Sequence, residues 1–175
     1  MKHLALVIGI IFLGIGLAQG LETVVQAPSF NLGSGDNEKI FLDKIKGKIV
    51  IIIYEAKDVI EQNRAFKNEL TSLLDCSEAL KAQSTVLPVI NCTSASWATK
   101  RIWKSNLRKN SKKENVTIYG DWDGKMFADY GMKDNTSNVV VIDASGIIRY
   151  FGSGKLDENE INKVKELLNR LVRYQ

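Results

Sequence analysis

The sequence is short of the side chains that most often carry acid–base and redox chemistry. Of its 175 residues one is histidine, His3, and two are cysteines, Cys76 and Cys92. A redox-active Cys-x-x-Cys motif needs two thiols one helical turn apart, and the cysteines here are too widely separated to form one. A histidine-rich metal centre is excluded as well. The sequence therefore gives no support to dithiol exchange or to a zinc site of the usual kind.

Acidic side chains do not supply a metal site either. Asp121, Asp123 and Asp129 lie close together, but the segment lacks the glutamate that closes a calcium-binding loop. We therefore predict neither a metal nor a cofactor. The formal net charge of +4 is too small to indicate a nucleic-acid partner.

The N-terminal residues differ in composition from the rest of the chain. An apolar run from Leu4 to Leu17 follows a short charged start, and Ala18-Gln19-Gly20 then supplies the small residues of a cleavage site. This pattern predicts a secretory signal peptide over residues 1–20 and a single domain over residues 21–175. The run is short for a membrane span, so an uncleaved anchor is the less favoured alternative. We expect the protein to be periplasmic or secreted, with cleavage near Gly20.

Export changes what the two cysteines are expected to do. In an oxidising compartment an even number of cysteines favours a structural disulfide, here Cys76–Cys92, which would add about 3 kcal/mol of stability through loop closure. Two separate buried thiols are the alternative. Because His3 would leave with the signal peptide, no cysteine–histidine catalytic pair remains in the mature chain.

Apolar patterns predict alternating strands and helices through the domain. The segment Ile49–Tyr54 (IVIIIY) is apolar without alternation, which indicates a central strand covered on both faces. The other predicted strands are Val86–Ile90, Val116–Tyr119, Val139–Asp143 and Ile147–Phe151. The predicted helices are Val59–Leu74, Trp97–Lys109, a short turn over Lys125–Tyr130, and a last helix that follows Asp157.

Single residues refine these elements. Asp58 and Asp157 are predicted helix N-caps, and Glu160 would complete a capping box with Asp157. Pro88 lacks a backbone N–H group, which favours an edge or end position for its strand.

The order of the elements is β-α-β-α-β, followed by a β-hairpin and a final helix. This order predicts an α/β fold with a mixed sheet, flanking helices on both faces, and a C-terminal β-hairpin plus helix. Such an arrangement is typical of thioredoxin-like domains.

Motifs in the second half of the chain resemble those of secreted thioredoxin-fold and peroxiredoxin-like proteins. These motifs are Tyr119–Gly124 (YGDWDG), Ala128–Met132 (ADYGM) and Val139–Ile148 (VVVIDASGII). A closer similarity is to the YtfJ family of exported, thioredoxin-like bacterial proteins. It rests on the cysteine-free turn Ala56–Asn63, on Ile90 and Asn91 with Lys112-Lys113, and on Gly154, Leu156 and Glu160. The resemblance implies a fold and a location, and the family has no established reaction to carry over.

The chain departs from the catalytic relatives at the site itself. Lys57 and Asp58 stand where the turn after the central strand would carry a nucleophilic thiol. Ser137 and Asn138 stand where thioredoxins carry a cis-proline and peroxiredoxins place an arginine nearby. We interpret all four as candidate binding residues. Lys57 and Asp58 lie at the carboxyl end of a central strand, where ligands approach this fold. Ser137 and Asn138 stand at the position whose cis-proline, in the relatives, shapes the substrate groove. A solvated turn capped by Asp58 is the alternative for the first two.

Cys92 is the one candidate nucleophile. It follows a predicted strand and precedes a predicted helix start, where the helix dipole would lower the pKa of a thiol. A thiol-dependent oxidoreductase or peroxidase-like enzyme that uses Cys92 with Cys76 is therefore the alternative function. A buried or disulfide-bonded cysteine is the commoner role for such a residue.

A run of basic residues with two tryptophans begins in the predicted second helix and continues just beyond it. Its members are Trp97, Trp103, Lys100, Arg101, Lys104, Arg108, Lys109, Lys112 and Lys113. The segment from Lys100 to Lys113 indicates peripheral contact with an anionic membrane or an acidic partner. The alternative is a solvated helix whose two tryptophans pack on the sheet.

These observations favour an exported thioredoxin-fold protein that lacks the redox motif. We expect a non-catalytic binding protein of the cell envelope rather than an enzyme. Its expected partner is an envelope protein, a peptide or a small ligand, and not a nucleic acid.

Overall fold

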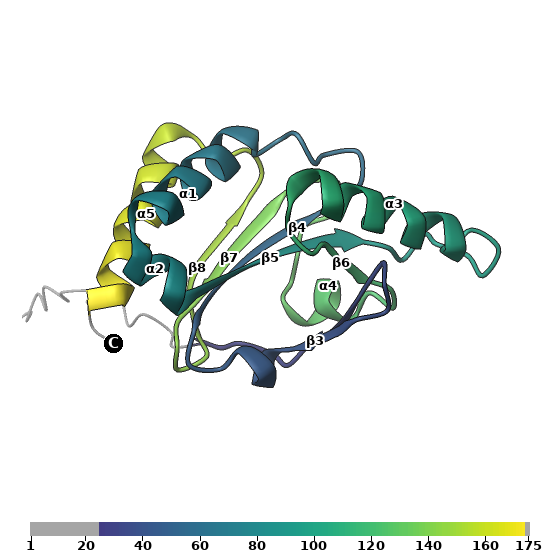
Figure 1. Ribbon diagram of the computed structural model, residues 1–175, viewed down its shortest axis with the longest axis horizontal. Helices are drawn as coiled ribbons and strands as arrows, with labels where there is room; N and C mark the ends of the chain where they lie inside the picture. The colour runs from purple at the N-terminus through teal and green to yellow at the C-terminus, as the bar shows by residue number, and fades with distance from the viewer. Residues whose placement is uncertain (1–24, 174–175) are drawn as a thin grey trace, which may run out of the picture.

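The computed structural model describes residues 25–173, so the predicted signal peptide at residues 1–20 lies outside the described residues. Within them, eight strands form one mixed sheet in the order β1-β8-β7-β4-β5-β6-β2-β3 (Figure 1). The strands are β1 (Val25–Gln26), β2 (Asn31–Ser34), β3 (Lys39–Phe41), β4 (Ile49–Glu55), β5 (Ser84–Asn91), β6 (Tyr119–Asp121), β7 (Asn138–Ile142) and β8 (Ile147–Ser153).

Helices cover both faces of the sheet, as the sequence predicts. They are α1 (Arg64–Cys76), α2 (Glu78–Gln83), α3 (Lys100–Glu114), α4 (Lys125–Asp129) and α5 (Glu158–Arg173), with a 3-10 helix η1 (Leu42–Ile45). In Figure 1, α1, α2 and α5 lie together above the sheet, α3 lies above its other end, and α4 lies below. The hairpin β7–β8 followed by α5 is the expected C-terminal unit.

Strand β4 is the centre of the fold. All seven of its residues are buried, and it pairs in parallel with β5 and antiparallel with β7. Successive side chains point to opposite faces of a strand. Ile51 therefore packs with the residues of α1 and α5, whereas Ile52 packs with Leu42 of η1 and Met126 of α4. The last two residues of β4 are Tyr54 and Glu55, and their polar groups point to opposite faces of the sheet at the carboxyl end of the strand.

Helix α1 begins later than the sequence predicts. It starts at Arg64 rather than Val59, and residues 56–63 form a series of turns. Asn63 occupies the N-cap position but makes no capping hydrogen bond, because its side chain bonds to the backbone of Gly154 and Leu156. Asp58 lies outside the helix and does not cap it, so that prediction is wrong.

Pro88 lies in an internal strand, which corrects the edge assignment. Strand β5 runs between β4 and β6, and Pro88 is opposite Ile53 of β4. The pairing of β5 with β6 begins only at Val89. The strand therefore accommodates a residue without an N–H group just before its second partner begins.

The two outer helices differ in how well local signals locate them. Helix α3 starts at Lys100 rather than Trp97 and ends at Glu114, where the C-cap residue Asn115 has a left-handed backbone conformation with φ of 51°. For α5, the predicted N-cap is confirmed, since the backbone N–H of Glu160 donates to Asp157 Oδ1 at 2.9 Å. The return bond of a capping box is replaced, because the Glu160 carboxylate accepts from the Tyr150 hydroxyl at 3.0 Å.

The packing of β4 predicts a clear contrast between two isoleucines. Ile51→Ala should lower the free energy of unfolding by about 2–5 kcal/mol, because it removes a fully buried side chain from the core. Ile102→Ala should change that free energy by less than about 0.5 kcal/mol, because the Ile102 side chain is 61% exposed. Urea denaturation followed by circular dichroism measures both. Equal losses would contradict the placement of β4 at the centre.

Candidate functional site

A buried carboxylate closes the end of β4 on the side of α1. Glu55 is 4% exposed, and its two oxygens accept from Lys67 Nζ at 2.6 Å and from Ser137 Oγ at 3.0 Å. Burial raises the pKa of Glu55, although Lys67 and Ser137 both act to lower it. The carboxylate thus joins α1 to the segment that leads into β7.

Two amide side chains hold the turn after β4 in place. Gln62 Oε1 accepts from the Thr136 hydroxyl at 2.9 Å and from the backbone N–H of Ser137 at 2.6 Å. Asn63 Nδ2 donates to the carbonyl of Gly154 at 2.9 Å, and its Oδ1 accepts from the N–H of Leu156 at 2.8 Å. The turn is therefore fixed to the start of β7 and to the segment between β8 and α5.

The charged residues of this turn point away from the fixed part. The side chains of Lys57 and Asp58 are 65% and 80% exposed, and Lys57 Nζ lies 4.0 Å from Asp58 Oδ1. The side chain of Ile60 is also exposed. We name residues 56–62 the charged turn. It combines a rigid base with an exposed, mixed-charge tip.

The other two candidate binding residues lie inside the protein. Ser137 and Asn138 are both fully buried. The Asn138 amide donates to the carbonyls of Lys133 and Thr136, and its Oδ1 accepts from the Lys133 N–H and the Ser153 hydroxyl. Their polar groups are used in joining loops to β7 and β8, and neither faces solvent beside Lys57 and Asp58.

A second buried carboxylate lies on the opposite face of the sheet. The Tyr54 hydroxyl donates to Asp121 Oδ2 at 3.1 Å, and the backbone N–H of Phe127 donates to the same oxygen at 2.9 Å. Burial raises the pKa of Asp121. The pKa of Tyr54 is also raised, mainly by burial and to a smaller extent by the nearby charge of Asp121. Asp121 lines a cleft of about 420 Å³ together with Asp43 and Lys125.

The sequence interpretation missed Glu55, Gln62, Asn63, Tyr54 and Asp121 as parts of these sites. One sequence feature could have identified Glu55, because it is a carboxylate at the end of an otherwise apolar strand. Tyr54 and Asp121 are separated by 67 positions, and no local pattern connects them.

The two cysteines are free thiols, and the expected disulfide Cys76–Cys92 is not formed. Cys76 ends α1 and is exposed, whereas Cys92 follows β5 and is fully buried. Strand β5 lies between them in the chain, and its eight residues span roughly 23 Å, far more than a disulfide bridges. Burial, together with the Asp121 charge, raises the pKa of Cys92 to about 12. The geometry therefore gives no support to a thiol site that pairs these residues.

The basic segment is divided between the two sides of α3. Arg108 forms an ion pair with Asp36 and donates to the Gly35 carbonyl, and Lys104 contacts Asn37. Lys100 lies over the Trp122 ring, 5.3 Å from its centroid. Trp103 is half-buried against the cluster of Cys92, Leu107 and Ile118, but Trp97 is 93% exposed, so only one tryptophan packs on the sheet.

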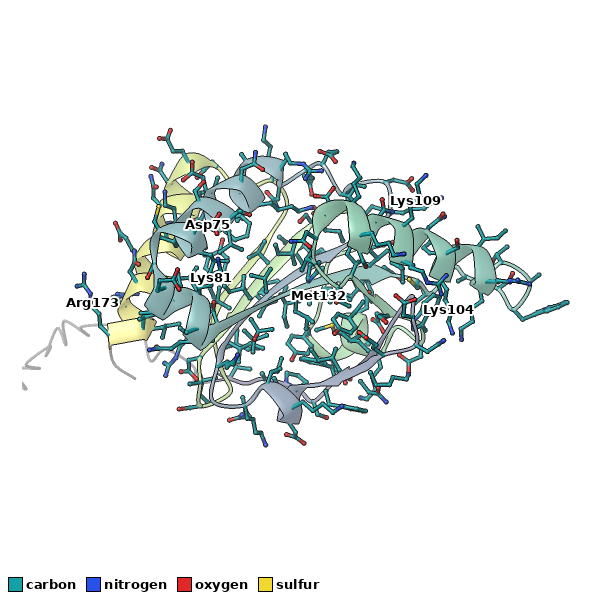
Figure 2. The ribbon with its side chains drawn as sticks, viewed as in Figure 1. Asp75, Lys81, Lys104, Lys109, Met132 and Arg173 are labelled. Atoms are coloured by element: carbon teal, nitrogen blue, oxygen red, sulfur yellow. The ribbon has the colours of Figure 1, made fainter. Side chains whose placement is uncertain are left out.

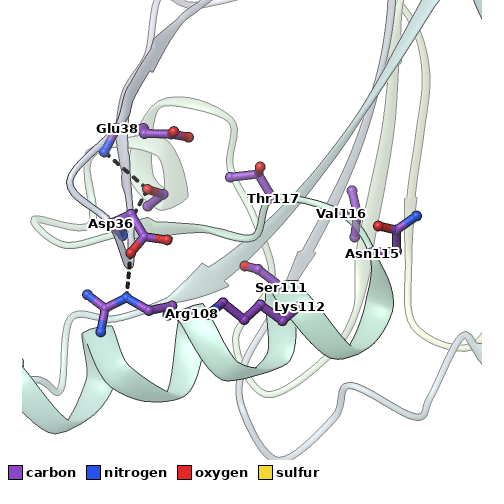
Figure 3. Close-up of a pocket in the computed structure, with 9 residues that line it drawn as sticks. Asp36, Glu38, Arg108, Ser111, Lys112, Asn115, Val116 and Thr117 are labelled. Atoms are coloured by element: carbon purple, nitrogen blue, oxygen red, sulfur yellow. Dashed lines mark hydrogen bonds and ion pairs between the residues drawn. The ribbon is translucent and has the colours of Figure 1, made fainter.

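A polar pocket of about 340 Å³ lies between this helix and the β2–β3 hairpin (Figure 3). Asp36 and Arg108, which form an ion pair, line it together with Glu38 and Lys112. The Ser111 hydroxyl accepts from the Ile118 N–H and donates to the Leu107 carbonyl. Of the groups around the pocket, Arg108 joins α3 to the hairpin through Asp36 and the Gly35 carbonyl.

Residues 25–173 hold neither a metal-binding cluster nor a membrane-spanning helix. No three histidine, cysteine, aspartate or glutamate side chains in this range are grouped so as to hold a metal ion. No helix in it combines the length and apolar character needed to cross a membrane.

Comparison with protein families places the chain. The model of a family described as "Bacterial protein of unknown function (YtfJ_HI0045)" matches residues 25–171, which is most of the sequence. The protein belongs to the YtfJ family. No curated protein matches the sequence.

Solved structures confirm the thioredoxin-like fold of this YtfJ-family protein. A thiol:disulfide interchange protein of the thioredoxin family from Chlorobium tepidum has a TM-score of 0.59 at 16% identity, covering 83% of this chain and 96% of its own. The exposed lipoprotein thioredoxin Etrx1 from Streptococcus pneumoniae has a TM-score of 0.57 at 20% identity, covering 80% and 99%. A DsbF homologue from Corynebacterium diphtheriae has a TM-score of 0.61 at 15% identity, covering 83% and 87%.

The contrast between the two thiols of the YtfJ-family protein is testable. In the native protein, a thiol reagent at neutral pH should modify Cys76 rapidly and Cys92 only after denaturation, because a thiol with a pKa of about 12 is scarcely ionised. Mass spectrometry of native and denatured samples gives the count. The Cys76→Ser variant should show no rapid modification, and rapid labelling of Cys92 in that variant would contradict its burial.

The buried Asp121 predicts a pH-dependent stability difference. Asp121→Asn keeps an oxygen that accepts from Tyr54 and Phe127 but does not titrate. Because the folded protein raises the pKa of Asp121, this group's contribution to stability is complete at low pH and is lost as pH rises through the raised value.

The variant should therefore gain stability relative to the wild-type protein as the pH rises from about 4 through the raised pKa of Asp121, by about 1.4 kcal/mol for each unit of the pKa rise. Tyr54→Phe should steepen the pH dependence, because the lost hydroxyl stabilises the charged carboxylate. Denaturant midpoints across this range give the result. A difference between Asp121→Asn and wild type that is constant with pH would contradict the inference.

Proposed function

We propose that the protein is a non-catalytic binding protein of the cell envelope and that its ligand, a protein or peptide, contacts the charged turn. One observation carries the proposal. The turn that carries the thiol in redox-active thioredoxin folds is kept rigid here by Gln62 and Asn63, while its charged tip is exposed. A segment held in one conformation loses little entropy when it binds, which favours a binding role.

The chemistry of the tip fits a polypeptide. Lys57 supplies a charged donor, Asp58 supplies a charged acceptor, and the exposed Ile60 supplies apolar contact area. A peptide backbone offers both carbonyl acceptors and N–H donors, so it can satisfy the two charges at once. An envelope location rests on the predicted signal peptide at residues 1–20.

The thiol-dependent alternative has less support. Cys92 is buried with a raised pKa, and Cys76 lies on a different element at the other end of β5. The candidate nucleophile of such an enzyme, Cys92, would need an accessible thiolate, and it is buried. Exchange with Cys76 would need the two thiols to be close together, and they are not.

Photo-crosslinking from the charged turn tests the proposal. A photoreactive phenylalanine analogue at position 60 should form crosslinked products with an envelope protein or peptide in the producing bacterium. Adding Lys57→Ala and Asp58→Ala should reduce the yield at least about tenfold, because the two charged contacts are lost together.

The matched control is a second exposed lysine–aspartate pair. Lys81 Nζ lies 3.3 Å from Asp75 Oδ1 near the other end of α1. Both residues are labelled in Figure 2. Asp75→Ala with Lys81→Ala should leave the crosslinking yield unchanged. Equal yields from the two double variants would reject the charged turn as the binding site.

A further inference from the structure

The segment around α3 has an unbalanced charge. Residues 92–113 contain seven basic side chains and no acidic one. Three of these bases, Lys100, Lys104 and Arg108, contact Trp122, Asn37 and Asp36. The other four are exposed, and they are Arg101, Lys109, Lys112 and Lys113. Figure 2 shows Lys109 on the outer side of α3.

Two large apolar side chains stand beside these charges. Trp97 is 93% exposed and Ile102 is 61% exposed, and both belong to the N-terminal end of α3 and the loop before it. Trp97 and Ile102 do not line the two pockets described above. In Figure 1 this loop extends beyond the sheet at the right of the molecule. The apolar groups therefore lie on a projecting part of the surface.

Hydrogen bonds in the turn around Trp97 hold this residue in its exposed position. The carbonyl of Ser96 accepts from the N–H of Thr99 at 3.1 Å and from that of Lys100 at 2.8 Å. The Ser96 and Thr99 hydroxyls are also hydrogen-bonded, at 3.0 Å. This turn fixes the chain on both sides of Trp97 and connects it directly to α3, so the indole projects from a structured support.

We propose that this surface, formed by Trp97, Ile102 and the exposed bases of α3, docks on an anionic lipid bilayer. Tryptophan is favoured at the boundary between headgroups and acyl chains, where its ring is buried and its N–H stays hydrated. Lysine and arginine beside it are attracted to anionic headgroups. A bilayer also fits a projecting apolar tip, whereas a protein partner would need a pocket of matching shape.

The proposal goes beyond binding at the charged turn but has a consequence for it. Arg64 at the start of α1 lies 3.5 Å from Glu114 at the end of α3. Docking through α3 would therefore hold the charged turn close to the membrane surface. Envelope proteins that diffuse along this surface could then reach the turn.

Co-sedimentation with lipid vesicles tests the docking surface. Protein purified after export should bind phosphatidylglycerol vesicles far more strongly than phosphatidylcholine vesicles of equal size, and added salt should weaken the binding. Reversing three charges, with Arg101→Glu, Lys109→Glu and Lys112→Glu, should reduce the affinity at least about tenfold. Trp97→Ala should reduce it several-fold and abolish fluorescence quenching by brominated lipid at that site.

A matched control separates the surface from overall charge. Lys48, Lys133 and Lys155 are exposed and lie away from α3. Changing these three to glutamate alters the net charge by the same amount and should leave vesicle binding within about twofold of the wild-type protein. Circular dichroism establishes that each variant is folded.

Three outcomes would overturn the proposal. They are no binding to phosphatidylglycerol vesicles, equal binding to neutral vesicles, and equal losses in the two triple variants. The first would favour an acidic protein as the partner of this surface. None of the three bears on crosslinking from residue 60, so the two proposals stand or fall separately.

Discussion

Burial of β4 on both faces is the constraint on which the rest of the structure depends. Its apolar residues have to be covered from two sides, and this requires helices above and below the sheet. The strand also delivers two polar side chains, Tyr54 and Glu55, into buried positions at its carboxyl end. Because an unpaired buried polar group is costly, each requires a partner. Asp121 meets one requirement, and Lys67 with Ser137 meets the other.

The charged turn follows directly from these buried partners. Glu55 fixes the point where the chain leaves the sheet, and Gln62 and Asn63 fix the point where it enters α1. Hydrogen bonds to segments next to β7 and β8 thus perform the structural role that a regular helix start would have. The thioredoxin-like fold is retained, and the turn after β4 presents the exposed side chains of Lys57 and Asp58 on a base that Gln62 and Asn63 hold in place. Rigidity and exposure together are what a binding surface needs.

Charge is distributed over the surface in a related way. The bases of α3 that face the β2–β3 hairpin are used in holding the two elements together, as Arg108 does with Asp36. Of those on the outer side, Lys113 lies 3.7 Å from Glu114 of the same helix, and Arg101 at the start of the helix is nearest in the chain to the exposed Trp97. One helix therefore serves packing on one side and offers a cationic, partly apolar surface on the other. The ion pair between Arg64 and Glu114 connects that surface to the charged turn.

The sequence by itself determined the order of the elements, the central place of β4, the N-cap at Asp157 and the absence of a Cys-x-x-Cys motif. Each of these depends on residues that are near one another in the chain. The spacing of apolar residues and the presence of capping residues therefore predict them from the sequence. The tertiary structure alone decided the start of α1, the separation of Cys76 from Cys92, and the pairing of Tyr54 with Asp121. These features depend on contacts between distant segments, and the energy of such contacts outweighs local propensity.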